Sequence, residues 1–425
     1  MIVFLIISLF ILLILGLPIY ISLSLSSLLS ILLFMDVNIG IVAQKMFAGI
    51  DKFVLMAVPF YIFAAEIMIS GDLAKRLLDW VNSFLRCFRG SHATATQLAC
   101  TCFGALSGSS PATVIAIGSF MYPELVDKKY GRKFSAGLIA SSGSVAILIP
   151  PSVTLLIYSA VTQVSVAALF LGGVGAGIVY SLCIIAYCYY YVRQRGNLTV
   201  SKIDWQETWQ LTKKVSWALG IPVVILGGIF FGVFTPTEAA GVSVVYSLFV
   251  TGIIYRKLTM EKLYKACLDS VILIAQIMIL LAAASIFGWV VTVSFVPQKI
   301  MSIIMVGIHS KYIFLLLINF VFLITGMFMD PGAALMVITP LILSPAIKLG
   351  IDPVHLGVLL TANLCIGMFS PPFGLNLFVA NSITGLQFSE MVSAIIPFFI
   401  VCLIALIIIT YLPEVTLLLP RLAGY

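Results

Sequence analysis

Two short polar clusters interrupt apolar stretches of the sequence, and their residue types suit ion binding. The first reads SGSSPAT over 107–113, and the second runs from Thr325-Gly326 to Asp330-Pro331-Gly332. Proline breaks a helix because it lacks the backbone donor and clashes with the preceding turn. The broken ends then offer carbonyl oxygens, which suit a bare cation, and amide groups, which suit a carboxylate.

Two Pro-Pro pairs provide a natural partner for each cluster. They lie at 150–151 and 371–372, and each follows small residues within an apolar stretch. We predict that each cluster faces one pair, so that oxygen atoms from both form a cation site. The first predicted cation site contains Ser107, Ser109, Gly143, Ala146 and Pro150. The second predicted cation site contains Thr325, Gly326, Gly367, Ser370 and Phe373.

A small anionic substrate is expected between the two clusters. No arginine or lysine lies in these motifs, so backbone amides, hydroxyls and one asparagine amide would hold its carboxylate. The predicted substrate residues are Ser110, Pro111, Thr113, Thr154, Asp330, Pro331, Gly332 and Asn376. The opposing interpretation is that serine and glycine merely allow close helix packing.

Two acidic residues stand inside apolar stretches, where ionisable groups are functional candidates. Asp330 would neutralise a cation, carry a proton, or cap the helix that starts at Pro331. Glu66 would act in transport or serve as a structural partner within the bundle. The sequence leaves these roles open.

Composition sets the class of protein that carries these motifs. Of 425 residues 62% are hydrophobic and 9% are charged, whereas soluble domains carry about 25% charged residues. Long apolar blocks recur throughout, and a membrane helix needs about 20 such residues. Barrel strands alternate polar and apolar residues, and this sequence does not. We predict an all-α polytopic membrane protein with no nucleic-acid partner.

Hydropathy divides the chain into apolar segments. The block 2–34 is expected to be one retained membrane helix, bent near Gly16 and Pro18, because it is too long and lacks the basic start of a signal peptide. The other expected segments are a helix at 53–70, an amphipathic arm at 72–89, a hairpin at 92–123, a broken helix at 134–160, helices at 165–192, 215–233, 238–255 and 266–296, a hairpin at 312–346, a broken helix at 354–384 and a last helix at 391–418.

An internal repeat relates the two halves of the chain. Pro111 and Pro331 differ by 220 positions, and the two Pro-Pro pairs differ by 221. Each half therefore reads as a helix, a re-entrant hairpin with proline at its tip, and a discontinuous helix. We expect a first repeat over 1–200, a connecting arm and linker helix over 201–235, and a second repeat over 236–425. Such inverted repeats are typical of secondary transporters, whose sites lie at the breaks.

Basic residues predict the orientation of the chain. Clusters at 128–133, 193–214 and 256–265 fall on one face if the first hairpin enters and leaves on the same side. Because basic loops favour the cytoplasm, this arrangement places the N-terminus inside and the C-terminus outside.

Several motifs in order along the chain resemble the large membrane subunit of TRAP transporters, of the DctM type. They are FGALSGSSPATVIAIGS (103–119), GSVAILIPPSVTLLIY (143–158), FTPTEAAG (234–241), GMFMDPGAALMVITP (326–340) and GMFSPPFGLNLFVA (367–380). The resemblance implies an ion-transporter-superfamily fold and an elevator-type importer of the bacterial inner membrane. It also implies at least two coupled sodium ions and an organic acid such as a C4-dicarboxylate or a sialic acid. The implied partners are a small four-helix membrane subunit, a periplasmic substrate-binding protein and membrane lipid.

Three alternatives compete with this interpretation. A stand-alone sodium/carboxylate carrier would need no binding protein. An intramembrane serine protease would use the GxxSG string at 104–108, although its spacing differs from the rhomboid pattern and the repeat would be unexplained. A channel would conduct without saturable uptake. We favour the transporter and expect no enzyme activity.

Overall fold

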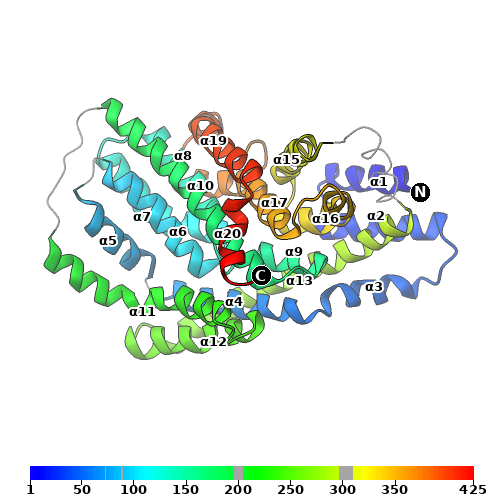
Figure 1. Cartoon of the computed structure of the whole chain (residues 1–425), viewed down its shortest axis with the longest axis horizontal. Helices are drawn as coiled ribbons and strands as arrows, with labels where there is room; N and C mark the ends of the chain where they lie inside the picture. Colours follow the sequence, from blue (N-terminus) through cyan, green and yellow to red (C-terminus); the bar gives the residue numbers. More distant parts are fainter. Residues whose placement is uncertain (72, 88–89, 196–203, 296–309) are drawn as a thin grey trace.

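The computed structural model describes residues 1–71, 73–87, 90–195, 204–295 and 310–425, and every regular element in these ranges is a helix (Figure 1). Within them, seven helices are long and apolar enough to cross a membrane. The bent pair formed by α3 (Gly40–Ile50) with η1 (Phe53–Met56) and α4 (Ala57–Ile69) makes an eighth span if it is counted as one. The predicted all-α polytopic membrane protein is confirmed.

The N-terminal block differs from its prediction. It forms two short helices, α1 (Ile2–Ile14) and α2 (Ile19–Phe34), instead of one bent helix. They pack on each other, and the rings of Phe4 and Phe34 lie 5.3 Å apart. Gly16 between them has φ +80°, which glycine adopts without strain and which lets the chain reverse. The 13 residues of α1 rise only about 20 Å, short of the bilayer core.

Both predicted hairpins are present. The first consists of α6 (Ser91–Ser107) and α7 (Ser110–Asp127), and the second of α15 (Lys311–Phe328) and α16 (Pro331–Lys348). The helices of each hairpin pack against each other, and two residues join them at each tip.

Both predicted discontinuous helices are present as well. The first is made of α8 (Arg132–Gly143), the 3₁₀ turn η2 (Ser144–Ile147) and α9 (Val153–Thr162). The second is made of α17 (Pro353–Gly367) and α18 (Leu375–Thr384). In both breaks the peptide bond between the two prolines is cis. After each break the helix has ten residues and ends at a residue in the left-handed region, Gln163 and Gly385, both with φ +61°.

The remaining helices follow the predicted segments with shifted ends. They are α5 (Leu73–Leu85), α10 (Val166–Arg195), α11 (Trp205–Phe230), α12 (Pro236–Phe249) with a π-helical turn η3 (Val250–Ile254), α13 (Met260–Val293), α19 (Phe388–Tyr411) and α20 (Glu414–Leu422). The last predicted helix, 391–418, is present as α19, but α19 ends at Tyr411 and the separate helix α20 begins at Glu414, after Pro413. Positions 72, 88–89, 201–203 and 296 of the predicted segments lie outside the described residues.

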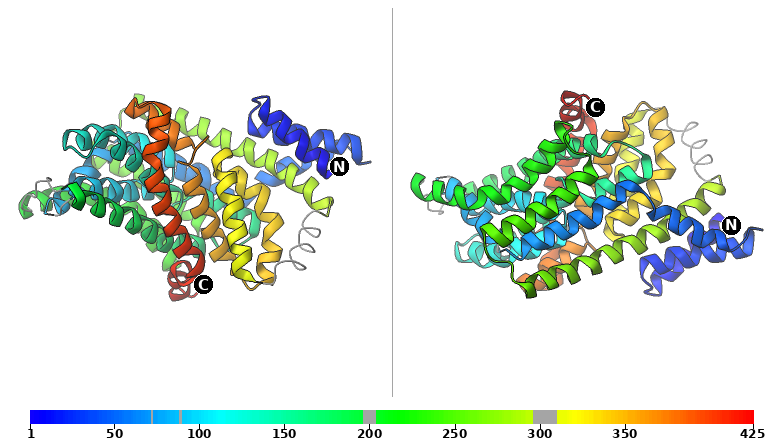
Figure 2. Two further views of the ribbon diagram at one scale, coloured as in Figure 1. Left: turned by 90° about the horizontal axis from the view of Figure 1, so that it is seen from above. Right: turned by 90° about the horizontal axis from the view of Figure 1, so that it is seen from below.

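One layer of helices supports the two hairpins. The long helix α13 packs against α2, α3 and α4, and α4 also packs against α12. Figure 2 shows α3, α4 and α13 side by side along one face of the molecule. The hairpins and broken helices lie above this layer. Each hairpin packs across the repeat, α7 on α18 and α16 on α9. The layer formed by α2, α3, α4, α12 and α13 is called the support layer below.

Close backbone approaches hold the upper helices together. A Cβ on Gly175 of α10 would lie 2.0 Å from the Val415 carbonyl oxygen of α20. By contrast, a Cβ on Gly227 of α11 would have no neighbour within 4 Å. Glycine is therefore required sterically at the first position and not at the second.

This contrast gives a stability prediction. Gly175→Ala forces α10 and α20 apart and lowers the melting temperature in detergent, because overpacking costs about 1–3 kcal/mol. Gly227→Ala is the matched control and leaves the melting temperature unchanged or slightly higher, because alanine favours the helix. Fluorescence-detected thermal unfolding measures both variants. Equal melting temperatures for the two variants would contradict the close packing.

Candidate ion and substrate site

The tip of the first hairpin gathers hydroxyl groups. Ser107 ends α6, and Gly108 with φ +58° turns the chain so that Ser109 precedes α7. The Ser107 Oγ lies 3.0 Å from the Thr113 Oγ1, which donates to the Ser109 carbonyl oxygen at 2.8 Å. No hydrogen bond involves the Ser109 hydroxyl in the described part of the chain, so its oxygen is free for a ligand.

This tip lies against the first break. A Cβ on Gly108 would be 2.5 Å from the Pro151 carbonyl oxygen, so only glycine fits there. Within the described ranges the Pro151 carbonyl accepts no hydrogen bond. A carbonyl without a partner beside a hydroxyl-rich turn is an arrangement that a hard cation can use.

The second tip is organised by Asp330. Its Oδ2 accepts a hydrogen bond of 2.9 Å from the Gly332 amide, so the carboxylate caps α16 just before Pro331. The capping role considered for Asp330 is therefore present in the structure. The residue is nevertheless exposed and lines a cavity, so the carboxylate also faces the space where a ligand would bind.

Matched backbone contacts join each hairpin to its own break. A Cβ on Gly104 of α6 would lie 2.7 Å from the Ala146 Cα, and one on Gly367 would lie 2.6 Å from the Gly326 carbonyl carbon of α15. Gly104 and Gly326 are 222 positions apart, and Ala146 and Gly367 are 221 apart. Because no side chain intervenes, the peptide groups of the hairpin and the break lie directly against each other in both halves.

Matched oxygen atoms also lack partners just before the two breaks. The Ser142 Oγ in α8 and the Asn363 Oδ1 in α17 are buried and make no hydrogen bond. These residues are 221 positions apart, the same spacing as the Pro-Pro pairs. Buried polar atoms in native proteins almost always have a partner, and these two atoms are exceptions at matched positions of the repeat.

A cavity of about 330 Å³ lies between the two hairpin tips. One wall comes from the tips and the breaks, and the other comes from α4 and α13 of the support layer. Among the described lining residues the ionisable ones are Glu66 and Asp330, and none is basic. The cavity is lined by Ile62, Ala65, Glu66, Ile69, 107–112, Ile147, Val153, Thr154, Ile157, Leu273, Gln276, Ile277, Leu280, Leu281, 330–332, Met368 and Leu375.

The structure places six of the eight predicted substrate residues on this cavity. They are Ser110, Pro111, Thr154, Asp330, Pro331 and Gly332. The other two lie behind its wall. Thr113 is buried against Ser107, and Asn376 is buried against Ser110. They support the first tip and do not line the cavity.

The predicted cation residues fall into two groups around the breaks. In the first group, Ser107 and Ser109 lie together at the hairpin tip. A Cβ on Gly143 would lie 3.2 Å from the Val114 amide nitrogen, and Ala146 touches Gly104. Pro150 is buried in the break. In the second group, Gly326 and Gly367 touch, and the Ser370 hydroxyl donates to the Ile366 carbonyl oxygen at 2.5 Å.

Two members of the second group lie apart from the Gly326–Gly367 contact. The Thr325 hydroxyl donates to the Val321 carbonyl within its own helix. The Phe373 side chain is 61% exposed and packs on Phe328, with the ring centroids 5.6 Å apart. Phe373 has only backbone atoms to offer a cation, whereas the Thr325 hydroxyl oxygen keeps its lone pairs when it donates.

The hydrogen bonds of Asn376 connect the two halves of the repeat. Its Nδ2 donates to the Ser110 Oγ at 2.7 Å and to the Ala140 carbonyl at 3.2 Å, and the Ser110 Oγ lies 3.0 Å from its Oδ1. The second broken helix thus holds the start of α7 in place, at the wall of the cavity.

Several residues that line or adjoin the cavity were not predicted from the sequence. Gln276 of α13 and the apolar lining of α4 and α13 were missed, as was Asn363. Gln276 and Asn363 are lone amide side chains within apolar runs, and that feature would have identified them. Glu66, whose role the sequence left open, lies on the cavity wall.

Comparison with known proteins identifies relatives of the whole chain. A family model described as the tripartite ATP-independent periplasmic transporter, DctM component, matches residues 6–415. A C4-dicarboxylate TRAP transporter large permease protein DctM from Pseudomonas aeruginosa is 40% identical over 95% of this chain and 94% of its own length. An isethionate TRAP transporter permease protein DctMQ from Oleidesulfovibrio alaskensis is 37% identical over 95% of this chain and 64% of its own length. A sialic acid TRAP transporter large permease protein SiaM from Vibrio cholerae is 33% identical, covering 96% of each chain.

A solved structure shares the fold. The Alcanivorax borkumensis YdaH transporter superposes with a TM-score of 0.56 over 90% of this chain and 87% of that chain, at 13% sequence identity. At this identity the likeness concerns architecture alone.

The hydrogen bonds of Asn376, which join the two halves of the repeat, give a testable prediction. Asn376→Ala leaves the buried Ala140 carbonyl and Ser110 hydroxyl without this partner, and an unsatisfied buried group costs about 1–3 kcal/mol. We expect a lower melting temperature for Asn376→Ala and a smaller loss for Ser110→Ala. The double variant should lower the melting temperature by less than the sum of the two single decreases, because the partners are coupled. Ser382→Ala, on the exposed face of α18, is the control. Strict additivity would contradict the contact.

Proposed function

Because the chain belongs to the tripartite ATP-independent periplasmic transporters as their DctM component, the large permease subunit, we propose that it imports a small organic acid together with sodium ions. It is a subunit of a secondary transporter and not an enzyme. The observation that carries the proposal is the cavity between the two hairpin tips, lined by two carboxylates and by no basic residue among its described members.

The charge of this cavity supports a cation as a second cargo. Two like charges about 4 Å apart repel by about 4 kcal/mol at an effective dielectric constant of 20. An organic anion that enters beside Asp330 and Glu66 meets this repulsion, because no arginine or lysine offsets it. Bound cations supply the missing positive charge, so the binding of acid and cation is coupled.

Two sodium sites are proposed at the matched contacts of hairpin and break. The first uses oxygens around Ser107, Ser109, Gly143, Ala146 and Pro150, with the unpartnered Ser142 hydroxyl beside them in sequence. The second uses oxygens around Thr325, Gly326, Gly367, Ser370 and Phe373, with the unpartnered Asn363 Oδ1 one turn earlier in α17. Sodium fits these donor sets because carbonyl and hydroxyl oxygens are hard ligands.

An elevator-type movement is the proposed route to alternating access. The hairpins and broken helices pack on each other as one unit through the Gly104–Ala146 and Gly326–Gly367 contacts. Helices α4 and α13 form the opposite cavity wall and belong to the support layer. Movement of the first unit along this wall would carry both sodium sites and the substrate together.

The substrate proposed first is a C4-dicarboxylate, the cargo named for the relative at 40% identity. Relatives at 37% and 33% identity are named for isethionate and sialic acid, which are also small organic acids. The free hydroxyl of Ser109 and the amides that start α7 and α16 are the groups proposed to hold its carboxylates.

Two protein partners are proposed. They are a small four-helix membrane subunit and a periplasmic substrate-binding protein, in keeping with a tripartite family. The DctMQ relative extends well beyond the length that this chain matches, which supports a membrane partner for the large subunit. The proposed location is the bacterial inner membrane, with the N-terminus inside and the C-terminus outside. The alternative function is that of a stand-alone sodium/carboxylate carrier, which would need no binding protein.

Sodium binding has a direct test that needs no substrate. Sodium chloride should raise the melting temperature relative to choline chloride of equal ionic strength, since a ligand at a hundredfold excess over its Kd stabilises by about 2.7 kcal/mol. Ser109→Ala and Asp330→Asn should each reduce this shift. Asparagine is also a good helix cap, so Asp330→Asn should keep its stability in choline.

Ser382→Ala should retain the full sodium shift, because that hydroxyl is exposed and bonded within α18. If no sodium shift occurs in the unmodified protein, or Ser109→Ala keeps the full shift, the proposed sodium sites are wrong.

Dependence on a binding protein separates the two transporter mechanisms. The chain is reconstituted with its small subunit in proteoliposomes, and uptake of radiolabelled succinate is measured with a sodium gradient directed inward. Uptake should require both the gradient and the added substrate-binding protein. Uptake that is equally fast without the binding protein would instead establish the stand-alone carrier.

A further inference from the structure

A second polar cavity lies far from the hairpin tips, at the end of the molecule formed by α5 and α11 (Figure 1). Its volume is about 400 Å³, and it is bounded by α5, α11 and the segment that follows the π-helical turn η3. Four basic side chains and one acidic side chain line it among the described residues. The lining consists of Lys75, Arg76, Asp79, Leu211, Lys214, Val215 and Lys257.

Hydrogen bonds hold the walls of this cavity in place. The Trp80 indole donates to the Thr212 hydroxyl at 3.0 Å, which joins the middle of α5 to α11. The Tyr255 hydroxyl donates to the Lys214 carbonyl at 2.8 Å, which joins the segment after the π-helical turn η3 to α11.

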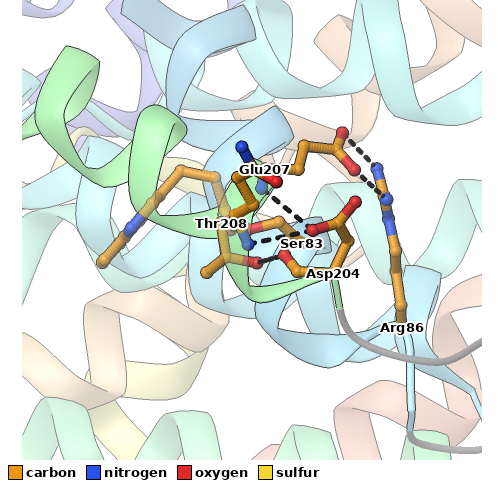
Figure 3. Close-up of polar contacts among 7 residues, drawn as sticks. Ser83, Arg86, Asp204, Glu207 and Thr208 are labelled. Carbon is orange, nitrogen blue, oxygen red and sulfur yellow. Dashed lines mark hydrogen bonds and ion pairs between the residues drawn. The ribbon is translucent and has the colours of Figure 1, made fainter.

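A bidentate ion pair closes the far end of the same interface. The Arg86 guanidinium donates to both carboxylate oxygens of Glu207, with an Nη2–Oε1 distance of 2.9 Å. Figure 3 shows this pair beside Asp204, whose carboxylate caps α11. The Glu207 contact raises the pKa of Arg86, and the guanidinium stays charged. The cavity is therefore a preformed feature of the fold, with α5 and α11 tied at two levels.

Three of the basic residues, Lys75, Arg76 and Lys214, share this lining with a single acidic residue among the described ones. The Arg76 guanidinium stacks over the Tyr255 ring, 4.4 Å from its centroid, which orients it without removing its charge. Asp79 is the one carboxylate among the described lining residues. Burial raises the pKa of Asp79, and Lys75 opposes this rise. The net charge of the lining remains strongly positive.

Aromatic residues place this cavity at the level of lipid head groups. Trp205 and Trp209 of α11 are 70% and 62% exposed, and Tyr264 near the start of α13 is 72% exposed. Tryptophan and tyrosine gather where the membrane meets water. The helix α5 is amphipathic, with Leu77 buried and Lys75 exposed, as expected for a helix that lies along the surface.

We propose that this cavity binds the phosphate-bearing head group of an anionic membrane lipid. The shared chemistry of a lipid head group and of free phosphate is an anionic oxygen cluster, and basic pockets between membrane helices suit it. The lipid is favoured because the partly exposed Leu211 adds an apolar floor beside the lysines. That floor would contact the glycerol and upper acyl chain, which inorganic phosphate lacks.

The test uses the full chain in nanodiscs of phosphatidylcholine with or without phosphatidylglycerol. Native mass spectrometry should detect one tightly retained phosphatidylglycerol per chain, and phosphatidylglycerol should raise the melting temperature. The double variant Lys75→Gln/Lys214→Gln should weaken retention tenfold or more, since each basic residue near an anionic surface contributes appreciably. The double variant Lys75→Arg/Lys214→Arg should retain the lipid, because the charge is preserved.

Three controls distinguish a lipid head group from free phosphate and test whether the variants misfold. Lys348→Gln removes an exposed lysine of α16 outside this cavity and should leave retention unchanged. In pure phosphatidylcholine the glutamine variant should melt at the same temperature as the unmodified protein. Excess inorganic phosphate should not displace the lipid. The proposal would be overturned if the glutamine variant retained phosphatidylglycerol as well as the unmodified protein does, or if Lys348→Gln lost as much of the lipid as the glutamine variant. Displacement of the lipid by phosphate would overturn it as well.

Discussion

A helix that ends inside a membrane leaves peptide groups without partners, and the centre of this fold is arranged around that constraint. Each unpaired group costs several kcal/mol in hydrocarbon, so such ends persist only where protein or a ligand meets them. Here the hairpin and the break of each half meet through Gly104–Ala146 and Gly326–Gly367, where no side chain separates the backbones. The peptide dipoles are thereby gathered at two points, on either side of one cavity.

The electrostatics of the cavity follow from the same arrangement. Under the proposed function, backbone amides and carbonyls supply the binding groups, so the site needs no arginine to hold an acid and no cluster of carboxylates to hold a cation. Asp330 is the exception at a tip, and the structure explains its position by the cap that it provides for α16. Its charge on the cavity wall is a consequence of this cap and gives the cavity its negative character.

Much of this architecture could be predicted from the sequence because proline and glycine act locally. The hairpin tips at Pro111 and Pro331 and both Pro-Pro breaks appear where their residues indicate. The packing of short apolar helices could not be predicted. Hydropathy does not distinguish a bent helix from the α1–α2 pair, and it did not reveal α3 or the separate α20. The cavity wall on α4 and α13 was missed because apolar residues that line a site have the same composition as residues that face lipid.

The division of the cavity between two sets of helices has a consequence for specificity. Under the proposed function, ion coupling depends on the tips and breaks, whereas Ile62, Ile277 and Leu280 of the opposite wall touch the cavity without contributing polar atoms. The size and shape of an accepted molecule can therefore be retuned by exchanging aliphatic residues on that wall, while the coupled ions keep their ligands. One scaffold can in this way serve a range of cargoes with a single energy source.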